Sequence, residues 1–290
     1  MRFITLLLLA GLFGNAHSGT LSPAAKEMAA APVTSQVTGV RHQGKVIWHE
    51  LITPDVRLAG KFYEKMFDWK LDYNGSYTDI FFEGKAIGGM IEVKPKTEPG
   101  AAALWIPSIS VKDVDKAVAA ATQLGGKTLK PAVDLGKRGR AALIADPDGR
   151  HFALLSTLSG DPQDGQASFN SWLWDEIWSK DMDSSETFYT DLLGYDQVAE
   201  GHDYLVLLAK NKWRMGIRKI GNDKEFSLWV PVIRVRDIHA STRQVEPAGG
   251  KVLLSPEQTP GDGKAALISD PTGALILIQQ WEYSASKGEQ

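Results

Sequence analysis

The sequence predicts an α+β protein made of two similar halves, each folded as a cupped mixed sheet. The first observation is an internal repeat at a constant spacing of 126 residues, in which Trp48, Glu50 and Tyr63 return as Trp174, Glu176 and Tyr189. The second observation is that each half contains, twice over, the order strand, helix, three strands. A fixed spacing between matching segments is the mark of a duplicated domain.

The first strand is predicted at residues 45–53. Side chains alternate along a strand, so Trp48 and Glu50 share one face and His49 takes the other. A register shifted by one residue would exchange these faces. Asp55 is placed to cap a helix, because its carboxylate can accept hydrogen bonds from the free N–H groups of the first turn. The helix that follows has an apolar stripe at helical spacing, formed by Ala59, Phe62, Tyr63 and Met66.

Three short strands complete the first unit, and the same order then recurs three more times. In the second unit a strand at 104–110 is followed by a helix that stops at Gly125 and Gly126, and then by strands near 127–130, 140–145 and 151–157. The second half copies both units between residues 171 and 281. Strand–helix–meander units indicate the α+β class, and two side by side give a sheet whose concave face can hold a ligand.

The chain is expected to begin with a secretory signal peptide. Arg2 is followed by an apolar run and then by small residues suited to cleavage, and the run is too short to span a membrane. We therefore expect a secreted or periplasmic protein with no stable membrane insertion after cleavage; an uncleaved anchor is the alternative. The predicted organisation is a signal peptide at 1–18, a flexible linker at 19–44, one domain at 45–157, a linker at 158–170, a second domain at 171–283 and a tail at 284–290.

Composition excludes some classes of function. The chain has 32 Lys and Arg against 35 Asp and Glu, a net charge of −3, and no basic block, so nucleic acid is not an expected partner. It has no cysteine, which excludes disulfides, thiol chemistry and a lipid-modified cysteine. A small-molecule ligand is the expected partner, and the protein is expected to be a monomer or a homodimer.

The repeated motifs resemble those of the glyoxalase, bleomycin-resistance and extradiol-dioxygenase family, also called the vicinal oxygen chelate (VOC) superfamily. Both halves carry a first strand ending at a helix-capping Asp, a Phe-Tyr helix, a middle strand followed by Val-x-Asp, and a Gly-Gly pair before Asp-Pro-x-Gly. The resemblance covers residues 45–157 and 171–282. It implies tandem VOC (glyoxalase-like) domains, each of two βαβββ units that form a cupped mixed sheet.

The resemblance also implies where a divalent metal would be held. Its ligands would stand seven residues before each capping Asp and four residues after the glycine of Asp-Pro-x-Gly. In this chain those positions are Trp48, Ile106, Ala153, Trp174, Val230 and Leu277. None of these side chains is a metal ligand, because metal sites use O, N or S donors of other residue types. No metal site and no cofactor are predicted, with a divalent metal at an atypical site kept as the alternative.

Two glutamates are the candidate catalytic residues. Glu50 and Glu176 lie two residues after the implied metal positions, on the strand face that should point into the cup. An apolar cup would raise the pKa of such a carboxyl, which suits a general base. A structural carboxylate bonded to the backbone or to an arginine is the alternative. The predicted ligand-binding residues are Trp48, Glu50, His151, Trp174 and Glu176.

Their roles differ. Trp48 and Trp174 would floor the two cups and stack on an apolar ligand. His151 shares a strand face with Ala153, while Trp105 and Trp229 are expected to pack between sheet and helices. Arg140 and Lys264 match between the halves and could pair with the glutamates, with an anionic ligand, or only with solvent. The Gly-rich stretch 136–139 lacks the strand–loop–helix context of a phosphate-binding loop, so that function is rejected.

Three functions follow as hypotheses. The leading one is metal-free binding of a small, partly apolar molecule in one or both cups. The first alternative is a VOC-type enzyme, lyase-like or hydrolase-like, that uses Glu50 or Glu176 with an atypical metal. The second alternative is a non-catalytic scaffold with filled cups. Whether the protein is an enzyme, and which βαβββ units pair to form each cup, the sequence leaves open.

Overall fold

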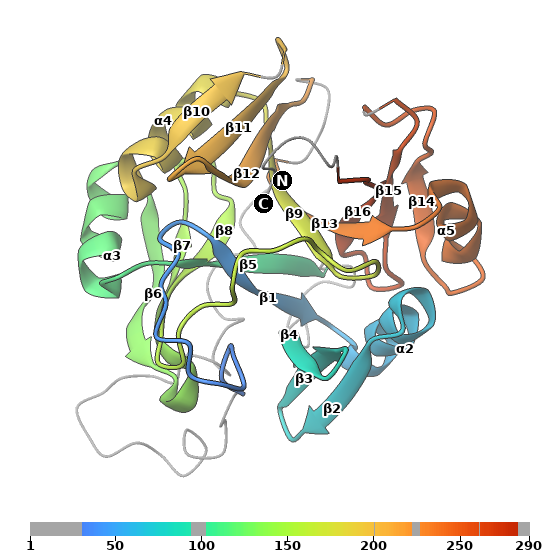
Figure 1. The fold of residues 1–290 in the computed structure, drawn as a ribbon, viewed down its shortest axis with the longest axis horizontal. Helices are drawn as coiled ribbons and strands as arrows, with labels where there is room; N and C mark the ends of the chain where they lie inside the picture. The colour runs from blue at the N-terminus through green and yellow to red at the C-terminus, as the bar shows by residue number, and fades with distance from the viewer. Residues whose placement is uncertain (1–30, 94–102, 200, 222–226, 261, 284–290) are drawn as a thin grey trace.

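The computed structural model describes residues 31–93, 103–199, 201–221, 227–260 and 262–283. The predicted signal peptide and the tail lie outside these ranges. Within them the chain forms two eight-stranded mixed sheets with α-helices on their outer sides (Figure 1). The predicted α+β class and the two-domain arrangement are confirmed.

The elements of the first half follow the predicted order. They are β1 Val46–Thr53, α2 Val56–Phe67, β2 Lys70–Asn74, β3 Tyr77–Phe82, β4 Lys85–Glu92, β5 Leu104–Ser110, α3 Val114–Gln123, β6 Lys127–Asp134, the 3₁₀ helix η1 Gly136–Arg138, β7 Gly139–Ala145 and β8 His151–Thr157.

Where the structure describes it, the second half repeats that order without a 3₁₀ helix. Its elements are β9 Trp172–Ser179, α4 Met182–Leu193, β10 Asp196–Ala199, β11 Tyr204–Ala209, β12 Lys212–Lys219, β13 Leu228–Val235, α5 Ile238–Val245, β14 Lys251–Leu254, β15 Ala265–Ser269 and β16 Leu275–Gln280.

Each sheet is built from one half of the chain. The strand order is β2-β3-β4-β1-β5-β8-β7-β6 in the first sheet and β10-β11-β12-β9-β13-β16-β15-β14 in the second. The two units of a half meet through the antiparallel pairs β1–β5 and β9–β13. The sequence left open which βαβββ units pair to form a cup. The two units of each half pair with each other, so each hollow is formed by a single domain.

All four α-helices of the described ranges begin at an aspartate. Asp55, Asp113, Asp181 and Asp237 have extended backbone angles, and each side chain accepts a hydrogen bond from the N–H three residues later. This satisfies one of the donors that a helix start leaves open. The cap predicted at Asp55 is confirmed, and it recurs in all four units.

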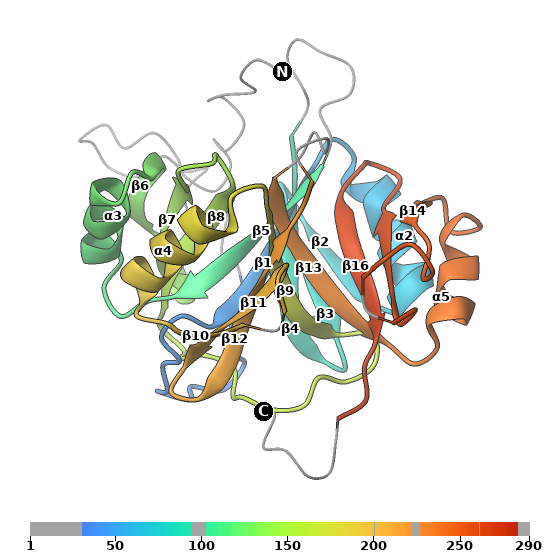
Figure 2. The ribbon, with the colours of Figure 1, turned by 90° about the horizontal axis from the view of Figure 1, so that it is seen from above.

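The two halves share two apolar cores. Figure 2 shows α2 beside α5 at one end of the molecule and α3 beside α4 at the other. One core joins the buried stripe of α2 to β13, α5, β15 and β16 of the second half, and the other joins α3 to α4. Trp105 and Trp229 belong to these cores, which confirms their predicted packing between sheet and helices.

The repeated sequence motifs meet across this interface. Tyr63 donates a hydrogen bond to Asp270 at 3.0 Å, and its counterpart Tyr189 donates to Asp146 at 2.8 Å. The ring of Phe62 lies so close to Gly250 that a Cβ atom there would come within 2.6 Å of it. The Phe-Tyr helix of each half is thus fitted to the Gly-Gly and Asp-Pro-x-Gly segments of the other.

A buried acid–base pair lies between the halves. His49 Nε2 is 2.8 Å from Asp175 Oδ1, and the imidazole stacks on Trp172 with ring centroids 4.1 Å apart. His49 therefore lies on the strand face opposite Glu50, as the alternation predicts. It faces the other domain and is only 3% exposed.

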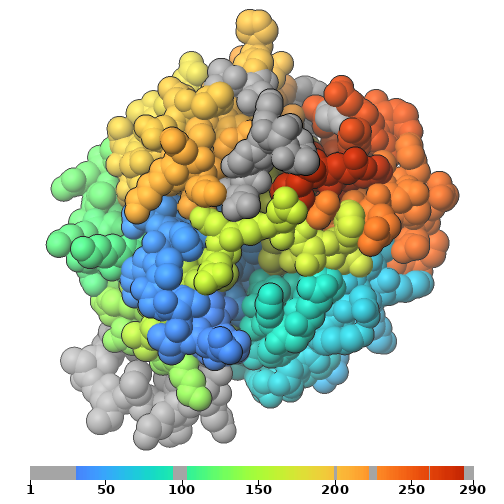
Figure 3. Space-filling view, viewed as in Figure 1, coloured from blue at the N-terminus to red at the C-terminus, as the bar shows by residue number. Residues whose placement is uncertain are grey.

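Residues 31–44 differ from expectation. They were predicted to form part of a flexible linker outside the fold, yet they pack along the first domain beside residues 158–161 (Figure 3). Thr38 N–H donates to Ser159 O at 2.7 Å, and His42 N–H donates to Asp161 at 2.7 Å. Backbone groups and small polar side chains make most of the hydrogen bonds that hold this segment, and the Ala, Ser, Thr, Pro and Gly content of residues 19–43 gave no sign of them.

Asp164, in the inter-domain linker, joins both domains. Its carboxylate is 2.9 Å from Lys45 Nζ of the first domain and 2.7 Å from Arg214 Nη1 of the second. Burial alone would raise the pKa of Asp164, but hydrogen bonds from Arg214 and Lys45 outweigh that effect and hold it well below its usual value.

We expect Asp164→Asn to lower the free energy of unfolding at pH 7 by roughly 1–2 kcal/mol, because hydrogen bonds to a charged group are lost. A depressed pKa stabilises the fold above the unfolded-state value, and this contribution disappears as the pH falls through the folded-state pKa. Urea titrations between pH 7 and pH 2 should therefore show the wild type and the variant converging at low pH. Asp68→Asn, in an exposed pair with Lys70, is the control and should change stability little. A constant difference across this pH range would contradict the assignment.

Candidate functional site

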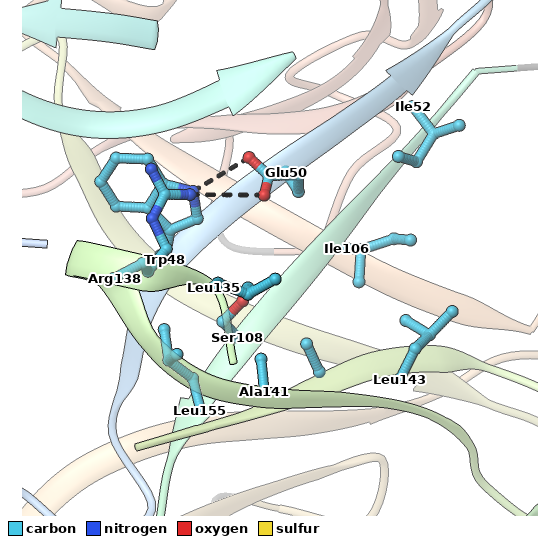
Figure 4. A pocket seen from close by; sticks show the side chains of 11 residues that line it. Trp48, Glu50, Ile52, Ile106, Ser108, Leu135, Arg138, Ala141, Leu143 and Leu155 are labelled. Atoms are coloured by element: carbon cyan, nitrogen blue, oxygen red, sulfur yellow. Dashed lines mark hydrogen bonds and ion pairs between the residues drawn. The ribbon is translucent and has the colours of Figure 1, made fainter. Parts of the chain in front are cut away.

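The hollow of the first sheet contains a small cavity (Figure 4). The space open to the centre of a water-sized sphere is about 30 Å³, enough for about two water molecules. Its lining comes from β1, β5, β7, β8 and the segment around η1: Trp48, Glu50, Ile52, Ile106, Ser108, Leu135, Arg138, Ala141, Leu143, Ala153 and Leu155. Trp48, Ile106 and Ala153 thus face the hollow as the predicted register requires.

Glu50 is the acid of this hollow and is only 7% exposed. It accepts hydrogen bonds from Trp48 Nε1 at 3.0 Å and from the hydroxyl of Tyr77. Burial raises the pKa of Glu50, while the nearby Arg138 cation and these hydrogen bonds oppose the rise. Glu50 therefore has side-chain partners, as expected of a structural carboxylate. It also lies on the cavity wall, as expected of a functional residue.

Arg138 is the residue of this site that the sequence did not identify. Its side chain is buried, and Nη1 donates to the Tyr77 hydroxyl at 2.7 Å and lies 3.5 Å from Glu50 Oε2. Nη2 is 3.6 Å from Asp79 Oδ1, and the guanidinium carbon is 3.9 Å from the ring centroid of Trp48. One guanidinium thus holds two buried carboxylates and stacks on the indole that floors the hollow.

The backbone around Arg138 explains its inward direction. Gly139 has φ +117°, which other L-residues rarely adopt, and a Cβ atom there would stand 2.1 Å from Ser156 O. The Gly-rich stretch 136–139, rejected as a phosphate loop, is therefore the turn that brings an arginine into the hollow. The spacing Gly-x-Arg-Gly was the available signal.

Arg140 lies on the other side of the sheet. Its Nε donates to Asp115 of α3 at 2.8 Å, and the Arg140 side chain is 36% exposed and that of Asp115 63% exposed. The possibility that Arg140 pairs with Glu50 is thus wrong, because strand alternation sends Arg140 to the helix side of β7. The arginine that pairs with Glu50 is Arg138, two residues before Arg140.

The second half has an equivalent polar cluster around Glu176. Arg218 donates to this carboxylate through Nε and Nη2, both at 2.8 Å. Tyr204 donates to it at 3.0 Å and Trp178 Nε1 at 2.8 Å, and Trp174 Nε1 donates to the Tyr204 hydroxyl at 2.9 Å. Each glutamate thus has a tyrosine, an indole and an arginine as partners.

The two arginines reach their glutamates by different routes. Arg218 is on β12 opposite Tyr204, whereas the residue opposite Tyr77 in the first half is Ile91. Arg138 instead arrives from η1, and the described residues of the second half contain no 3₁₀ helix. Arg138 was not identified from the sequence because a comparison of the two halves finds only residues at matching positions. In these clusters only the contact between the glutamate and the tyrosine occurs at matching positions.

A glycine makes room for each Glu–Tyr contact. A Cβ atom on Gly89 would lie 1.8 Å from the Tyr77 hydroxyl, and one on Gly216 would lie 2.2 Å from the Tyr204 hydroxyl. Both glycines stand twelve residues after their tyrosine, so this spacing is a second signal in the sequence.

We expect Gly89→Ala to lower the free energy of unfolding by about 1–3 kcal/mol, because the methyl group must displace the buried Tyr77 hydroxyl. Gly165→Ala is the matched control, since nothing lies within 4 Å of a Cβ atom there and its φ is not positive. Urea denaturation of both variants measures the difference. A Gly89→Ala protein as stable as the control would show that the hydroxyl is free to move away.

His151 is not part of either cluster. It begins β8 on the face of Ala153, is half-buried, and is absent from the residues that line the first cavity. Burial lowers the pKa of His151, which favours the neutral imidazole. The structure thus brings Trp48 and Glu50 together in one hollow, Trp174 and Glu176 in the other, and leaves His151 aside.

The donors present do not fit a divalent metal. The positions where the family resemblance implies ligands carry Trp48, Ile106 and Ala153 in the first hollow, and the nearby Glu50 already accepts from two donors beside a guanidinium. In the ranges that the structure describes, no group of three or more His, Cys, Asp or Glu side chains could hold a metal ion. Neither cluster supplies the carboxylate and imidazole set of such a site.

The fold, the paired hollows and the repeated helix caps define a tandem VOC-type protein. The chain belongs to the Glyoxalase/Bleomycin resistance protein/Dioxygenase superfamily, whose model matches residues 45–154 and 175–278. These matches fall inside the domains predicted at 45–157 and 171–283.

Several curated proteins are similar along most of their length. "Putative glyoxylase CFP32" of Mycobacterium bovis is 29% identical over 255 residues, covering 81% of this chain and 94% of that protein. "Anthracycline biosynthesis protein DnrV" of Streptomyces peucetius is 25% identical over 272 residues, covering 84% of this chain and 97% of that protein.

Solved structures share the fold at low sequence identity. The Mn(II)-bound glyoxalase of Novosphingobium aromaticivorans aligns with a TM-score of 0.60 and 13% identity, covering 83% of each chain. A variant of homoprotocatechuate 2,3-dioxygenase from B. fuscum aligns with a TM-score of 0.59 and 13% identity, covering 86% of this chain and 74% of its own. At such identities the likeness concerns the fold alone. No helix in the described ranges is long and apolar enough to cross a membrane.

Proposed function

We propose that the protein binds a small, partly apolar molecule in the hollow of its first domain without a metal ion. The observation that carries this proposal is the lining of the cavity. Aliphatic and indole side chains stand at the positions where the family resemblance implies metal ligands, around one buried Glu50–Arg138 pair. Ligand sites commonly combine apolar walls with a few polar groups that fix orientation.

The lining suggests a division of roles. Trp48 offers an indole for stacking, and Ile106, Ala153 and Leu155 offer apolar contact. The Glu50–Arg138 pair offers a hydrogen-bond acceptor and a cationic donor at one side of the cavity. The relatives named for anthracycline biosynthesis support an aromatic ligand as the first class to test.

The second hollow is the other place where such a molecule could bind. Trp174, Glu176 and Arg218 repeat the chemistry of the first hollow, with Trp213 5.9 Å from Trp174 between ring centroids. The proposal favours the first domain because its cavity is lined by both the acid and the implied metal positions.

A ligand screen with two filling variants tests the proposal. A panel of small aromatic and aliphatic compounds, including a hydroxyanthraquinone, is screened by thermal shift, and hits are titrated by tryptophan fluorescence. Ala153→Leu, which fills the first cavity, should weaken binding at least about tenfold, since steric filling removes contacts worth more than 1.4 kcal/mol. Leu277→Phe, which enlarges the matching buried side chain of the second domain, should leave binding unchanged. The reverse pattern would move the site to the second domain, and the absence of any hit would favour the filled-cup scaffold.

The enzyme alternative has its own test. The described residues supply no ligand set for a metal, so the structure adds nothing in favour of Glu50 or Glu176 acting with one. Metal analysis of protein purified without chelator should find less than one equivalent of divalent metal. Stoichiometric metal that is lost in Glu50→Gln would overturn the metal-free proposal.

We also propose that the protein is exported and loses a signal peptide that ends at Ala16 or Ser18. The basic start and short apolar run support this, and N-terminal sequencing of the mature protein tests it. A new terminus after Ala16 or Ser18 is expected. An intact Met1 would indicate the anchor instead.

A further inference from the structure

We propose that the mouth of the first hollow is an intrachain peptide-binding site, in which residues 31–34 act as a displaceable strap. The strap excludes a ligand of more than a few atoms, and the ligand that replaces it carries a carbonyl acceptor next to an N–H or O–H donor. This inference deepens the binding function proposed above and rests on it.

The backbone of Ala31 is held at two points. Arg138 Nε donates to Ala31 O at 2.9 Å, and the Ala31 backbone N–H lies on the side of Asp79, where it opposes the rise that burial gives the pKa of that carboxyl. Arg138 and Asp79 are buried and belong to the polar cluster around Glu50. The cluster thus binds one residue of the chain through its N–H and its C=O, the two groups common to every peptide.

Val33 completes the strap by entering the hollow. It is 3% exposed and packs in the apolar cluster that contains Trp48, Tyr77 and Leu155. All the other fully buried members of that cluster lie in strands of the first sheet. Val33 is therefore the one buried member of this cluster that can move away without breaking the pairing of two strands.

Thr34 anchors the end of the strap. Its N–H donates to Ser159 Oγ at 3.2 Å, and its hydroxyl lies 3.3 Å from Ser159 O and 3.5 Å from Gly160 O. Residues 35–37 that follow are exposed, and Val37 is 81% exposed. Segments with few buried contacts open at low cost, well below global unfolding. The strap can therefore swing about residues 35–37 while Thr38 stays bonded to Ser159.

The size of the cavity makes this opening necessary. The cavity is lined by strand residues and the segment around η1 and has about 30 Å³ open to a water-sized centre, so a molecule of ligand size does not fit unless a residue packed on that lining, such as Val33, moves away. In the second hollow the apolar cluster contains only residues between 173 and 277 of the second domain, with no segment like the strap in the described part of the chain. The strap distinguishes the two hollows.

Unpaired polar atoms indicate the ligand's chemistry. Arg138 Nη2 and Asp79 Oδ1 form a buried ion pair 3.6 Å apart, and among the described residues neither atom makes a hydrogen bond. A buried donor and acceptor left open favour a partner that satisfies both. An amide or a carboxylic acid has that pattern, as the peptide unit at Ala31 does, and an apolar group beside it would take the place of Val33.

One pair of variants tests the strap itself. Val33→Asp puts a charge where the hollow is apolar, so we expect backbone amides of residues 33 and 34 to exchange with deuterium at least tenfold faster than in the wild type. Val37→Asp, in the same segment but exposed, should exchange as the wild type does. Slow exchange in Val33→Asp would overturn the strap, and this measurement needs no ligand.

Dye binding tests whether the strap and a ligand compete for the first hollow. The probe is 1-anilinonaphthalene-8-sulfonate, with near-ultraviolet circular dichroism to confirm native packing. Val33→Asp should bind it at least fivefold more tightly than the wild type or Val37→Asp. Fast exchange without tighter dye binding would contradict the competition and the proposed function together, while leaving the mobility of the strap established.

A reversible staple gives an independent test. The chain has no cysteine, so Thr34→Cys with Ser159→Cys provides a single disulfide between residues already in contact. The oxidised protein should bind N-acetyl-valine amide, which carries the proposed pattern, at least tenfold more weakly than the reduced protein. Equal affinities in the two states would overturn the proposal that the strap blocks the site.

Discussion

Replacing Arg138 by methionine is expected to lower the free energy of unfolding by about 3–5 kcal/mol at pH 7. The reason is that Glu50 and Asp79 are both buried, and the substitution removes the cation between them while leaving their charges in place. Urea denaturation followed by circular dichroism measures the change. Arg140→Met, two residues along, is the matched control: its pair with Asp115 is exposed, so a loss below about 1 kcal/mol is expected.

The pH dependence gives this prediction a second check. Burial already raises the pKa of Glu50 and of Asp79 in the folded protein, and loss of the Arg138 cation raises both further. A carboxyl with a raised folded-state pKa binds protons more tightly when folded, so stability increases as the pH falls from that pKa towards the unfolded value. The defect of Arg138→Met should therefore shrink between pH 7 and pH 5. A defect that is equal at both pH values would show that lost packing, and not charge, is the cause.

Phe62→Ala is expected to cost about 3–5 kcal/mol and to weaken both halves together. Phe62 is fully buried in the core that α2 shares with the second domain, where its ring contacts Gly250. Truncation of a buried phenylalanine removes apolar contacts and leaves a cavity. Leu58→Ala, one turn earlier on the same helix and 45% exposed, is the control and should cost much less.

Calorimetry distinguishes a shared core from two separate ones. Because residues from both halves make up each core, we expect one unfolding transition in the wild type and one, at lower temperature, in Phe62→Ala. Two transitions, with only the first-domain transition shifted, would show that the halves unfold independently and that the interface contributes little to stability.

Local patterns predicted much of the fold. The alternation along residues 45–53 placed Trp48 and Glu50 in the hollow and His49 on the opposite face, and Asp55 caps its helix as expected. Those features depend on neighbours a few residues apart, which the sequence displays directly. The packing of Trp105 against the helices was predictable for the same reason.

The rest depends on contacts between distant residues. Arg138 reaches Glu50 across 88 positions, and the arginine of the other half reaches its glutamate from a different element, β12, so neither periodicity nor the repeat could reveal Arg138. The bond from Arg138 to Ala31 uses a backbone oxygen, which every residue has, and residues 31–44 therefore resembled a linker. The partner of Tyr63 is Asp270, and nothing in either motif alone shows that they meet.

The pair His49–Asp175 has a consequence for how the molecule could have arisen. Tyr63 with Asp270 and Tyr189 with Asp146 use one surface twice, as two identical subunits would around a symmetry axis. At that axis identical subunits would set histidine against histidine or aspartate against aspartate. A histidine paired with an aspartate 2.8 Å away requires that the residue types at the two equivalent positions differ. Duplication of the half permits that, because the two positions then lie in separate copies and can change independently.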